Sequence, residues 1–180
     1  MILSLALVLA GSATYTSSLA FNEPDGFRGI TWKSSEAHVN AKWPGLSCYP
    51  SSSPPSDRSC SSDTPISIGD IPVQPLLGFR SNEFSYVKFS FDEAKFRMME
   101  RIFTERYGPP TRHSQREEQN RMGARYMNEI RHWIGPTVSI TLQKYGSKVT
   151  EGLASFAPTS MAQDMAKQIE DTAQKGAGDL

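Results

Sequence analysis

The side chains that most often carry catalysis are present but scattered along the sequence. The histidines, His38, His113 and His132, lie far apart, and none forms the i, i+4 pair or the Glu-x-x-His arrangement that zinc sites use. The chain has no Gly-x-Ser-x-Gly elbow for a hydrolase nucleophile and no glycine-rich phosphate loop. Asp92 and Glu93 are adjacent acids, but neighbouring residues at a helix start do not face each other. The sequence therefore predicts no catalytic residue, no metal site and no cofactor.

The stretch from Arg112 to Trp133 is rich in arginine and also contains aromatic residues. Guanidinium groups bind phosphates and carboxylates through paired hydrogen bonds, so this pattern predicts a surface for phosphate, a polyanionic glycan or an acidic protein. The alternative, which the charge balance favours, is a solvated loop that Glu117, Glu118 and Glu129 partly neutralise. The candidate binding residues are Arg112, Arg116, Arg121, Arg125, Tyr126, Arg131, His132 and Trp133.

Cys48 and Cys60 are the two cysteines of the chain. In an oxidising compartment, an even number of cysteines predicts pairing, here as one disulfide bond. The residues between them are rich in serine and proline and lack apolar periodicity, so we expect a disulfide-closed loop within 46–65. The spacing is not Cys-x-x-Cys and no histidine adjoins either cysteine, which favours a structural bridge over a reactive thiol.

The N-terminus has the features of a signal peptide. Residues 2–10 form an apolar run that is too short to span a bilayer as a helix. Ser18-Leu19-Ala20 fits a small-x-small cleavage motif before Phe21, and Gly11-Ser12-Ala13 is a second such site. The sequence predicts a cleaved signal peptide over 1–20 and a soluble periplasmic or secreted protein without a transmembrane segment. The alternative is a buried N-terminal strand or helix.

Length and charge narrow the class of protein further. The 180-residue chain has a formal charge of zero, because 19 Lys and Arg balance 19 Asp and Glu. Whole-protein charge therefore favours neither nucleic acid nor an anionic membrane as a partner. The length suits one domain, which we expect over 21–175, followed by a frayed tail at 176–180.

The densest apolar patterning lies in 84–110. Val87, Phe89 and Phe91 alternate with polar residues, which predicts a half-buried strand. Asp92 can cap a following helix whose apolar residues recur at i, i+3 and i+7. Gly108 and the two prolines after it end that helix. We expect this strand and helix to form the centre of the core.

The remaining strand patterns lie on both sides of this centre. Pro72 and Pro75 lack backbone donors, so their segment is predicted to be an edge strand or a bent one. Residues 111–125 are either a mobile loop or the start of a long strand pair. The segments with strand character are 26–32, 66–80, 126–134, 137–145 and 153–156.

Two further helices complete the predicted elements. One follows Ser34 or Ser35, and the other follows Thr159 or Ser160. Hairpin-linked strands with helices between the groups predict an α+β fold, in which an antiparallel sheet carries two to three helices packed mainly on one face.

Several short motifs are combined in this chain: Gly26-Phe-Arg-Gly-Ile-Thr-Trp32 after the apolar N-terminus, Gly78-Phe79 before a strand, Tyr107-Gly-Pro109 at a helix end, and a late Trp133. Together they resemble a pattern in small exported bacterial proteins of unknown function, over much of 24–157. The resemblance implies a periplasmic or secreted α+β domain and supplies no catalytic residue.

Export, an α+β pattern and the lack of a catalytic constellation favour a non-enzymatic binding or assembly module of the cell envelope. Its expected partner is another envelope or extracellular protein. One alternative is a secreted inhibitor of a hydrolase that inserts loop 48–60, since a pinned loop loses little entropy on binding. A second is an enzyme whose site assembles only in three dimensions, from residues such as Asp70, His113, His132 or Glu129.

Overall fold

The computed structural model describes residues 21–51, 56–119, 123–164, 167 and 171. The predicted signal peptide and the predicted tail at 176–180 lie outside the described residues. The helical elements are α1 (Glu36–Lys42), the 3₁₀ turn η1 (Glu93–Lys95) and α2 (Phe96–Tyr107), and residues 159–164 are also helical. The strands are β1 (Gly26–Phe27), β2 (Ile30–Thr31), β3 (Leu46–Pro50), β4 (Arg58–Ser62), β5 (Ile66–Ile68), β6 (Ile71–Arg80), β7 (Glu83–Asp92), β8 (Arg112–Gln119), β9 (Arg125–Ile134), β10 (Val138–Gln143) and β11 (Glu151–Pro158).

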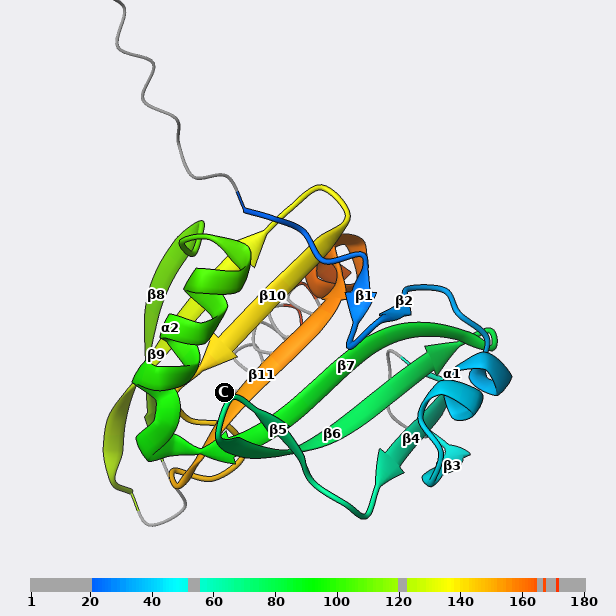
Figure 1. The fold of residues 1–180 in the computed structure, drawn as a ribbon. Coiled ribbons are helices and arrows are strands. Elements are labelled where there is room, and N and C mark those ends of the chain that lie inside the picture. Colours follow the sequence, from blue (N-terminus) through cyan, green and yellow to red (C-terminus); the bar gives the residue numbers. More distant parts are fainter. Residues whose placement is uncertain (1–20, 52–55, 120–122, 165–166, 168–170, 172–180) are drawn as a thin grey trace, which may run out of the picture.

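An antiparallel sheet dominates the molecule, as Figure 1 shows. Its strand order is β3-β4-β6-β7-β11-β10-β9-β8, with β5 paired to β6, while β1 and β2 form a separate hairpin. The predicted antiparallel sheet is therefore confirmed, although the helices form a smaller part of the fold than the sequence indicated. Among the described residues, no helix has the length and apolar character needed to cross a membrane.

The helices lie on both faces of the sheet. In Figure 1, α1 and α2 lie in front of it and residues 159–164 lie behind it. Thr159 bonds to Ser139, whose register places it on the face away from α2. We call the face covered by α2 the helix face and the other the back face.

The core is centred on β7 and α2, as predicted. Val87, Phe89 and Phe91 of β7 are buried on the helix face. The buried residues of α2 that cover this face are Phe96, Met99 and Phe103. The Asp92 carboxylate accepts a hydrogen bond from the Ala94 amide at 2.9 Å, which confirms the predicted cap. Gly108 ends α2 with a φ of 85°, a conformation that glycine adopts without steric cost.

The edge prediction for residues 66–80 is wrong. A turn at Gly69-Asp70 divides the segment into β5 and β6, and β6 lies inside the sheet between β7 and a side shared by β5 and β4. The two prolines are tolerated because each lacks one neighbour. Pro72 precedes the residues that pair with β7, and Pro75 lies between those that pair with β5 and those that pair with β4.

Two predicted irregular segments are paired strands. The expected loop over 46–65 contains the β3–β4 hairpin, in which Cys48 lies opposite Cys60. The serine- and proline-rich sequence did not predict this hairpin, because the hairpin is stabilised by the pairing of β4 with β6 and not by alternating apolar residues. Of the two options for 111–125, the strand pair is confirmed, since β8 pairs with β9 along its whole length.

Glycines in the sheet let aromatic rings lie across neighbouring strands. Gly152 of β11 faces Phe91 of β7 in the register. A Cβ atom on Gly152 would lie 2.3 Å from Phe91 Cζ, far inside van der Waals contact. Gly78 has the same relation to Tyr86, with a Cβ placed 1.8 Å from the ring. The packing of the two aromatic rings therefore requires glycine, which has no side chain, at both positions.

We expect Gly152→Ala to lower the free energy of unfolding by about 1–3 kcal/mol, because the methyl group forces the Phe91 ring out of its packed position. Urea unfolding followed by circular dichroism measures the change. Ser155→Ala, on the same strand but the back face, is the control and should change stability much less. Equal unfolding midpoints for Gly152→Ala and the natural protein would show that the ring contact does not limit the packing.

Candidate functional site

The predicted arginine-rich surface is divided between the two faces of the β8–β9 hairpin. Side chains alternate along a strand, so neighbours in the sequence point in opposite directions. The register places Arg112, Arg116, Tyr126 and His132 toward the back face and Arg125, Arg131 and Trp133 toward the helix face, while Arg121 lies outside the described residues.

The members on the back face mostly have protein partners. Arg116 donates to Glu118, which also accepts from the Tyr126 hydroxyl. His132 is half-buried and its Nε2 lies 3.1 Å from the Ser114 hydroxyl. Burial, together with the nearby Arg112 guanidinium, lowers the pKa of His132. These side chains stabilise the hairpin, and Arg112 remains exposed beside them.

The candidate binding residues on the helix face have more protein contacts than those on the back face. Trp133 is fully buried, and its indole nitrogen donates to the Gly108 carbonyl at 2.7 Å. The Arg131 side chain is 8% exposed and bonds to Glu100 and Glu129. Arg125 pairs with Glu117 at 3.2 Å. None of the three offers an unpaired group on an open surface.

Arg97, Glu100, Glu129 and Arg131 form an ionic cluster between α2 and β9, which we call the ionic quartet, and Lys144 Nζ also lies 3.9 Å from the Glu129 carboxylate. Arg97 bonds to both carboxylates, at 3.0 Å to Glu100 and 2.8 Å to Glu129. Arg131 also bonds to both, at 3.0 Å to Glu129. The two guanidinium groups lie 5.4 and 5.5 Å from the centre of the Phe96 ring, close enough for cation–π attraction. Each charge is compensated, so the quartet fixes α2 on the sheet.

The quartet also sets the protonation of Glu129. Burial alone would raise the pKa of this carboxyl group, but hydrogen bonds from Arg131 and Arg97 outweigh it, and the pKa is lowered. A carboxylate with a depressed pKa in the folded state stabilises the fold above its unfolded pKa. That contribution is lost as the pH falls through the folded pKa.

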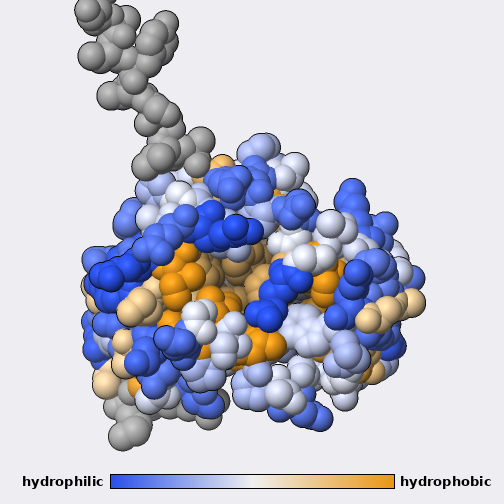
Figure 2. All heavy atoms as spheres, in the orientation of Figure 1, coloured by the Kyte–Doolittle hydropathy of each residue, from blue (hydrophilic) through white to orange (hydrophobic). Residues whose placement is uncertain are grey.

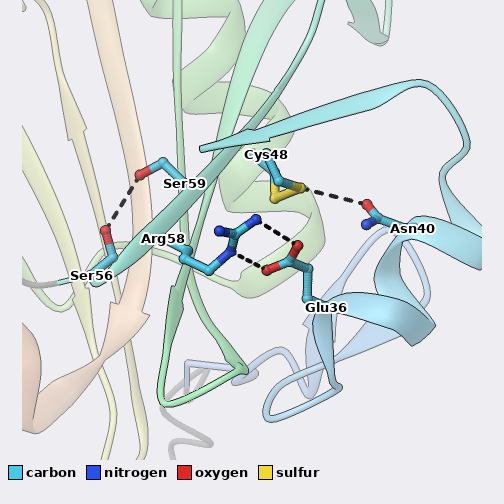
Figure 3. The surroundings of a disulfide bond; sticks show 7 residues. Glu36, Asn40, Cys48, Ser56, Arg58 and Ser59 are labelled. Carbon is cyan, nitrogen blue, oxygen red and sulfur yellow. Dashed lines mark hydrogen bonds and ion pairs between the residues drawn. A yellow bond between two sulfur atoms is a disulfide. The ribbon is translucent and has the colours of Figure 1, made fainter. Parts of the chain in front are cut away.

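The disulfide bond between Cys48 and Cys60 is confirmed. Figure 3 shows its surroundings, where Arg58 of β4 forms two hydrogen bonds with Glu36 of α1, at 2.6 and 3.0 Å. Cys48 Sγ lies 3.8 Å from Asn40 Oδ1, a contact without a hydrogen bond because a disulfide sulfur carries no hydrogen. The ion pair holds α1 against the end of the β3–β4 hairpin that lies next to its connecting loop, and the disulfide joins the two strands beside it.

Glu36 and the two cysteines bring three potential metal ligands within 4.8 Å of one another. Both sulfurs are committed to the disulfide and the carboxylate is committed to Arg58. Zinc and similar ions bind thiolates, not disulfide sulfurs. The oxidised cluster is therefore a structural element and not a metal site.

A groove of about 690 Å³ opens on the helix face beside α2. It lies between α2, the N-terminal segment 22–29 and the β5–β6 turn at 67–69, and Phe27, Phe103 and Phe156 line it. Ile68 and Ile102 add apolar surface. In Figure 2, hydrophobic atoms lie at the floor of a hollow in this region, and hydrophilic atoms border it.

The N-terminal segment is tied down on one side of the groove. The Asn22 amide donates to the Tyr107 carbonyl at 2.9 Å, which fixes the segment to the end of α2. The Glu23 carboxylate accepts hydrogen bonds from the Thr137 and Val138 amides at 3.1 and 2.9 Å. Because these donors occupy it, the Glu23 carboxylate is a structural clamp.

Two arginines border the groove. Arg28 lies in the tight turn between β1 and β2, and its guanidinium donates to the Ser67 carbonyl at 3.2 Å. Arg106 lies in the last turn of α2, next to Tyr107, whose hydroxyl it bonds. Burial raises the pKa of Tyr107 and the Arg106 charge partly opposes that rise, so the hydroxyl stays protonated at neutral pH. The groove thus lies above nearly buried aromatic rings, and its rim carries the guanidinium groups of Arg28 and Arg106 and the hydroxyl group of Tyr107.

The groove contains none of the predicted candidate residues. Asp70, His113, His132 and Glu129 do not line it, and the last two point to opposite faces of β9. The sequence signals that exist are weak: the Phe27-Arg28-Gly29 stretch was predicted as part of a strand, and Arg106 as part of an amphipathic helix. Neither pattern distinguishes a groove residue from an ordinary surface residue.

We expect Glu129→Gln to lower the free energy of unfolding by about 1–3 kcal/mol at pH 7, because the uncharged amide bonds less strongly to Arg97 and Arg131. This difference should shrink as the pH falls below the ordinary carboxyl pKa of 4.5, where the natural protein also loses the charge. Urea unfolding at a series of pH values measures it. Glu105→Gln, an exposed change on α2, is the control, and a difference independent of pH would contradict the role of the charge.

Removal of the disulfide through Cys48→Ala with Cys60→Ala should cost about 2–3 kcal/mol, since the bond closes a short loop in the unfolded chain. Alanine avoids placing a hydroxyl in the fully buried position of Cys60. Thermal unfolding with and without dithiothreitol measures the effect. Reductant should lower the melting temperature of the natural protein and leave the variant unchanged; insensitivity of the natural protein would contradict a stabilising bond.

Comparisons with protein-family models, curated proteins and solved structures found no match. The resemblance to small exported bacterial proteins therefore stays a prediction, and the functional argument rests on the groove and on the chemistry of the residues around it.

Proposed function

We propose that this protein is an exported, non-enzymatic binding module of the cell envelope and that the groove beside α2 is its binding site. The observation that carries the proposal is a concavity of about 690 Å³ beside α2, in which Ile68 and Ile102 are partly exposed above the buried rings of Phe27, Phe103 and Phe156. Concave sites of this size, with apolar walls and a few polar groups, are typical of ligand binding.

The disulfide bond supports the export part of the proposal. Cys48 and Cys60 are bonded, and such bonds persist in the periplasm or outside the cell and are rare in a reducing cytoplasm. The apolar run at 2–10 and the small residues up to Ala20 supply a matching signal. Both observations favour an envelope or secreted location.

The arrangement of the charged residues supports binding over catalysis. Glu129 is held in the ionic quartet and His132 lies on the back face, so these two predicted acid–base candidates lie away from the groove. Of the carboxylates that line the groove, Glu23 is occupied by the amides of Thr137 and Val138, and Asp25 is exposed. The proposal includes the predicted packing of the helices mainly on one face of the sheet, which is supported by α1 and α2 lying together on the helix face (Figure 1).

A photoreactive residue in the groove tests this function. We expect p-benzoylphenylalanine in place of Ser67 to capture a bound molecule in cells, since this exposed position lines the groove and only its backbone carbonyl bonds to Arg28. Mass spectrometry of the purified protein would identify the adduct and the N-terminus, which we expect to be Phe21. The partner class that we predict from the sequence is an envelope or extracellular protein, and a smaller ligand would also support the groove.

The matched control carries the same photoreactive residue at Lys88, which is exposed on the back face of β7. Capture at position 67 and not at 88 supports the groove as the site. No adduct at 67, or identical adducts at both positions, would contradict it.

A hydrolase inhibitor remains the second candidate. The disulfide and the Glu36–Arg58 pair hold the two strands where they enter the connecting loop, and a loop with fixed ends loses less entropy on insertion. The tip at 52–55 lies outside the described residues. Inhibition of a lysozyme or protease by the purified protein would favour this candidate over the groove.

A further inference from the structure

We propose that the groove is a site for an amphipathic carboxylate, a small molecule with an apolar chain or ring and one carboxylate end. Its apolar part lies against Ile68 and Ile102, which line the groove and are partly exposed, and its carboxylate binds Arg28 and Arg106. The inference rests on the proposed function, since it names the ligand class of the same groove.

The first support is the pairing of the arginines. Among the residues that the structure describes, five arginines form ion pairs with glutamates, and five form none: Arg28, Arg80, Arg101, Arg106 and Arg112. Of these five, Arg28 and Arg106 border the same groove. A guanidinium beside apolar surface binds a carboxylate strongly, because it can donate two parallel hydrogen bonds and loses little hydration. The five paired arginines are Arg58, Arg97, Arg116, Arg125 and Arg131.

The acidic side chains at the groove do not cancel this charge. Glu23 is occupied by the amides of Thr137 and Val138. Asp25 is exposed, so water screens its repulsion of a bound anion. The two guanidinium groups therefore outweigh the Asp25 carboxylate, and the local charge favours an anion over a cation.

The backbone at Arg28 is the second support. Arg28 has a φ of 51° at the first position of the two-residue turn, followed by Gly29 at 77°. Asparagine and glycine are the residues that fit such a turn, and other residues adopt this conformation at a cost of about 1 kcal/mol. Arginine is not a residue that favours this turn, and its side chain instead contacts another part of the groove lining. The turn extends that side chain toward Ser67, across the groove.

The floor defines the other end of the ligand. Phe103 and Phe156 have ring centres 5.6 Å apart, and Phe27 lies 5.5 Å from Phe156, so the three rings form a packed and nearly buried base beneath the groove. Ile102, which is partly exposed, lies one helical turn before Arg106 on the same side of α2. A ligand whose apolar part lies on Ile102 therefore has its polar end close to Arg106.

Calorimetric titration of the purified protein with decanoate, decanol and decylammonium tests the inference, at concentrations below self-association of each probe. We expect decanoate to bind about tenfold more tightly than decanol, and decylammonium to bind more weakly than either. Arg28→Asn keeps a residue that suits the turn and removes the charge. Arg106→Gln removes the second charge. Each should weaken decanoate binding about three- to tenfold and leave decanol binding unchanged.

Arg101→Gln is the matched control, because it removes the same charge from an exposed position of α2 outside the groove and should leave every affinity unchanged. Arg28→Asn should melt at the same temperature as the natural protein or higher, which separates lost binding from lost folding. Equal affinities for decanoate and decanol would overturn the carboxylate site and leave the groove as an apolar binding site. No binding of any probe would overturn the small-molecule inference, while capture at position 67 would still support the proposed function.

Discussion

The packing of Phe103 against the helix face of the sheet is the contact on which the position of α2 depends. Its ring centre lies 6.5 Å from that of Phe89, 5.7 Å from Trp133 and 5.6 Å from Phe156, so one side chain of α2 contacts β7, β9 and β11. Buried aromatic rings contribute both hydrophobic area and favourable ring geometry. The bond from the Trp133 indole to the Gly108 carbonyl then fixes the end of α2 above the same strands.

The two sides of α2 differ in how their charges are compensated. Toward β9 the helix presents Glu100 to Arg131, and in the quartet there each guanidinium group is paired with carboxylates. Toward the N-terminal segment it presents Ile102 and Arg106 to the groove, where the guanidinium has no carboxylate partner among the described residues. The charged groups on the β9 side of α2 are compensated, and this side is a structural contact. The Arg106 charge on the groove side is not compensated, and we interpret this side as a binding surface.

Local patterns were reliable where one element determines its own structure. The alternation of Val87, Phe89 and Phe91, the Asp92 cap and the Gly108 end follow from backbone geometry and neighbouring residues. The same reasoning failed for β6 and for the β3–β4 hairpin, because the neighbours of a strand are chosen by distant residues. Pro75 is compatible with an interior strand because it lies between the residues of β6 that pair with β5 and those that pair with β4, where no strand on that side requires its backbone N–H.

By itself, the sequence determined the central strand and helix, the pairing of Cys48 with Cys60 and the antiparallel character of the sheet, since these depend on local periodicity or on a count of two thiols. Only the tertiary structure decided which arginines are available. Strand alternation sends Arg131 under α2 and into the quartet, while Arg28 and Arg106, 78 positions apart in the sequence, meet at one groove. A charge becomes a binding group only when its partners are known, and those partners come from segments that no local pattern connects.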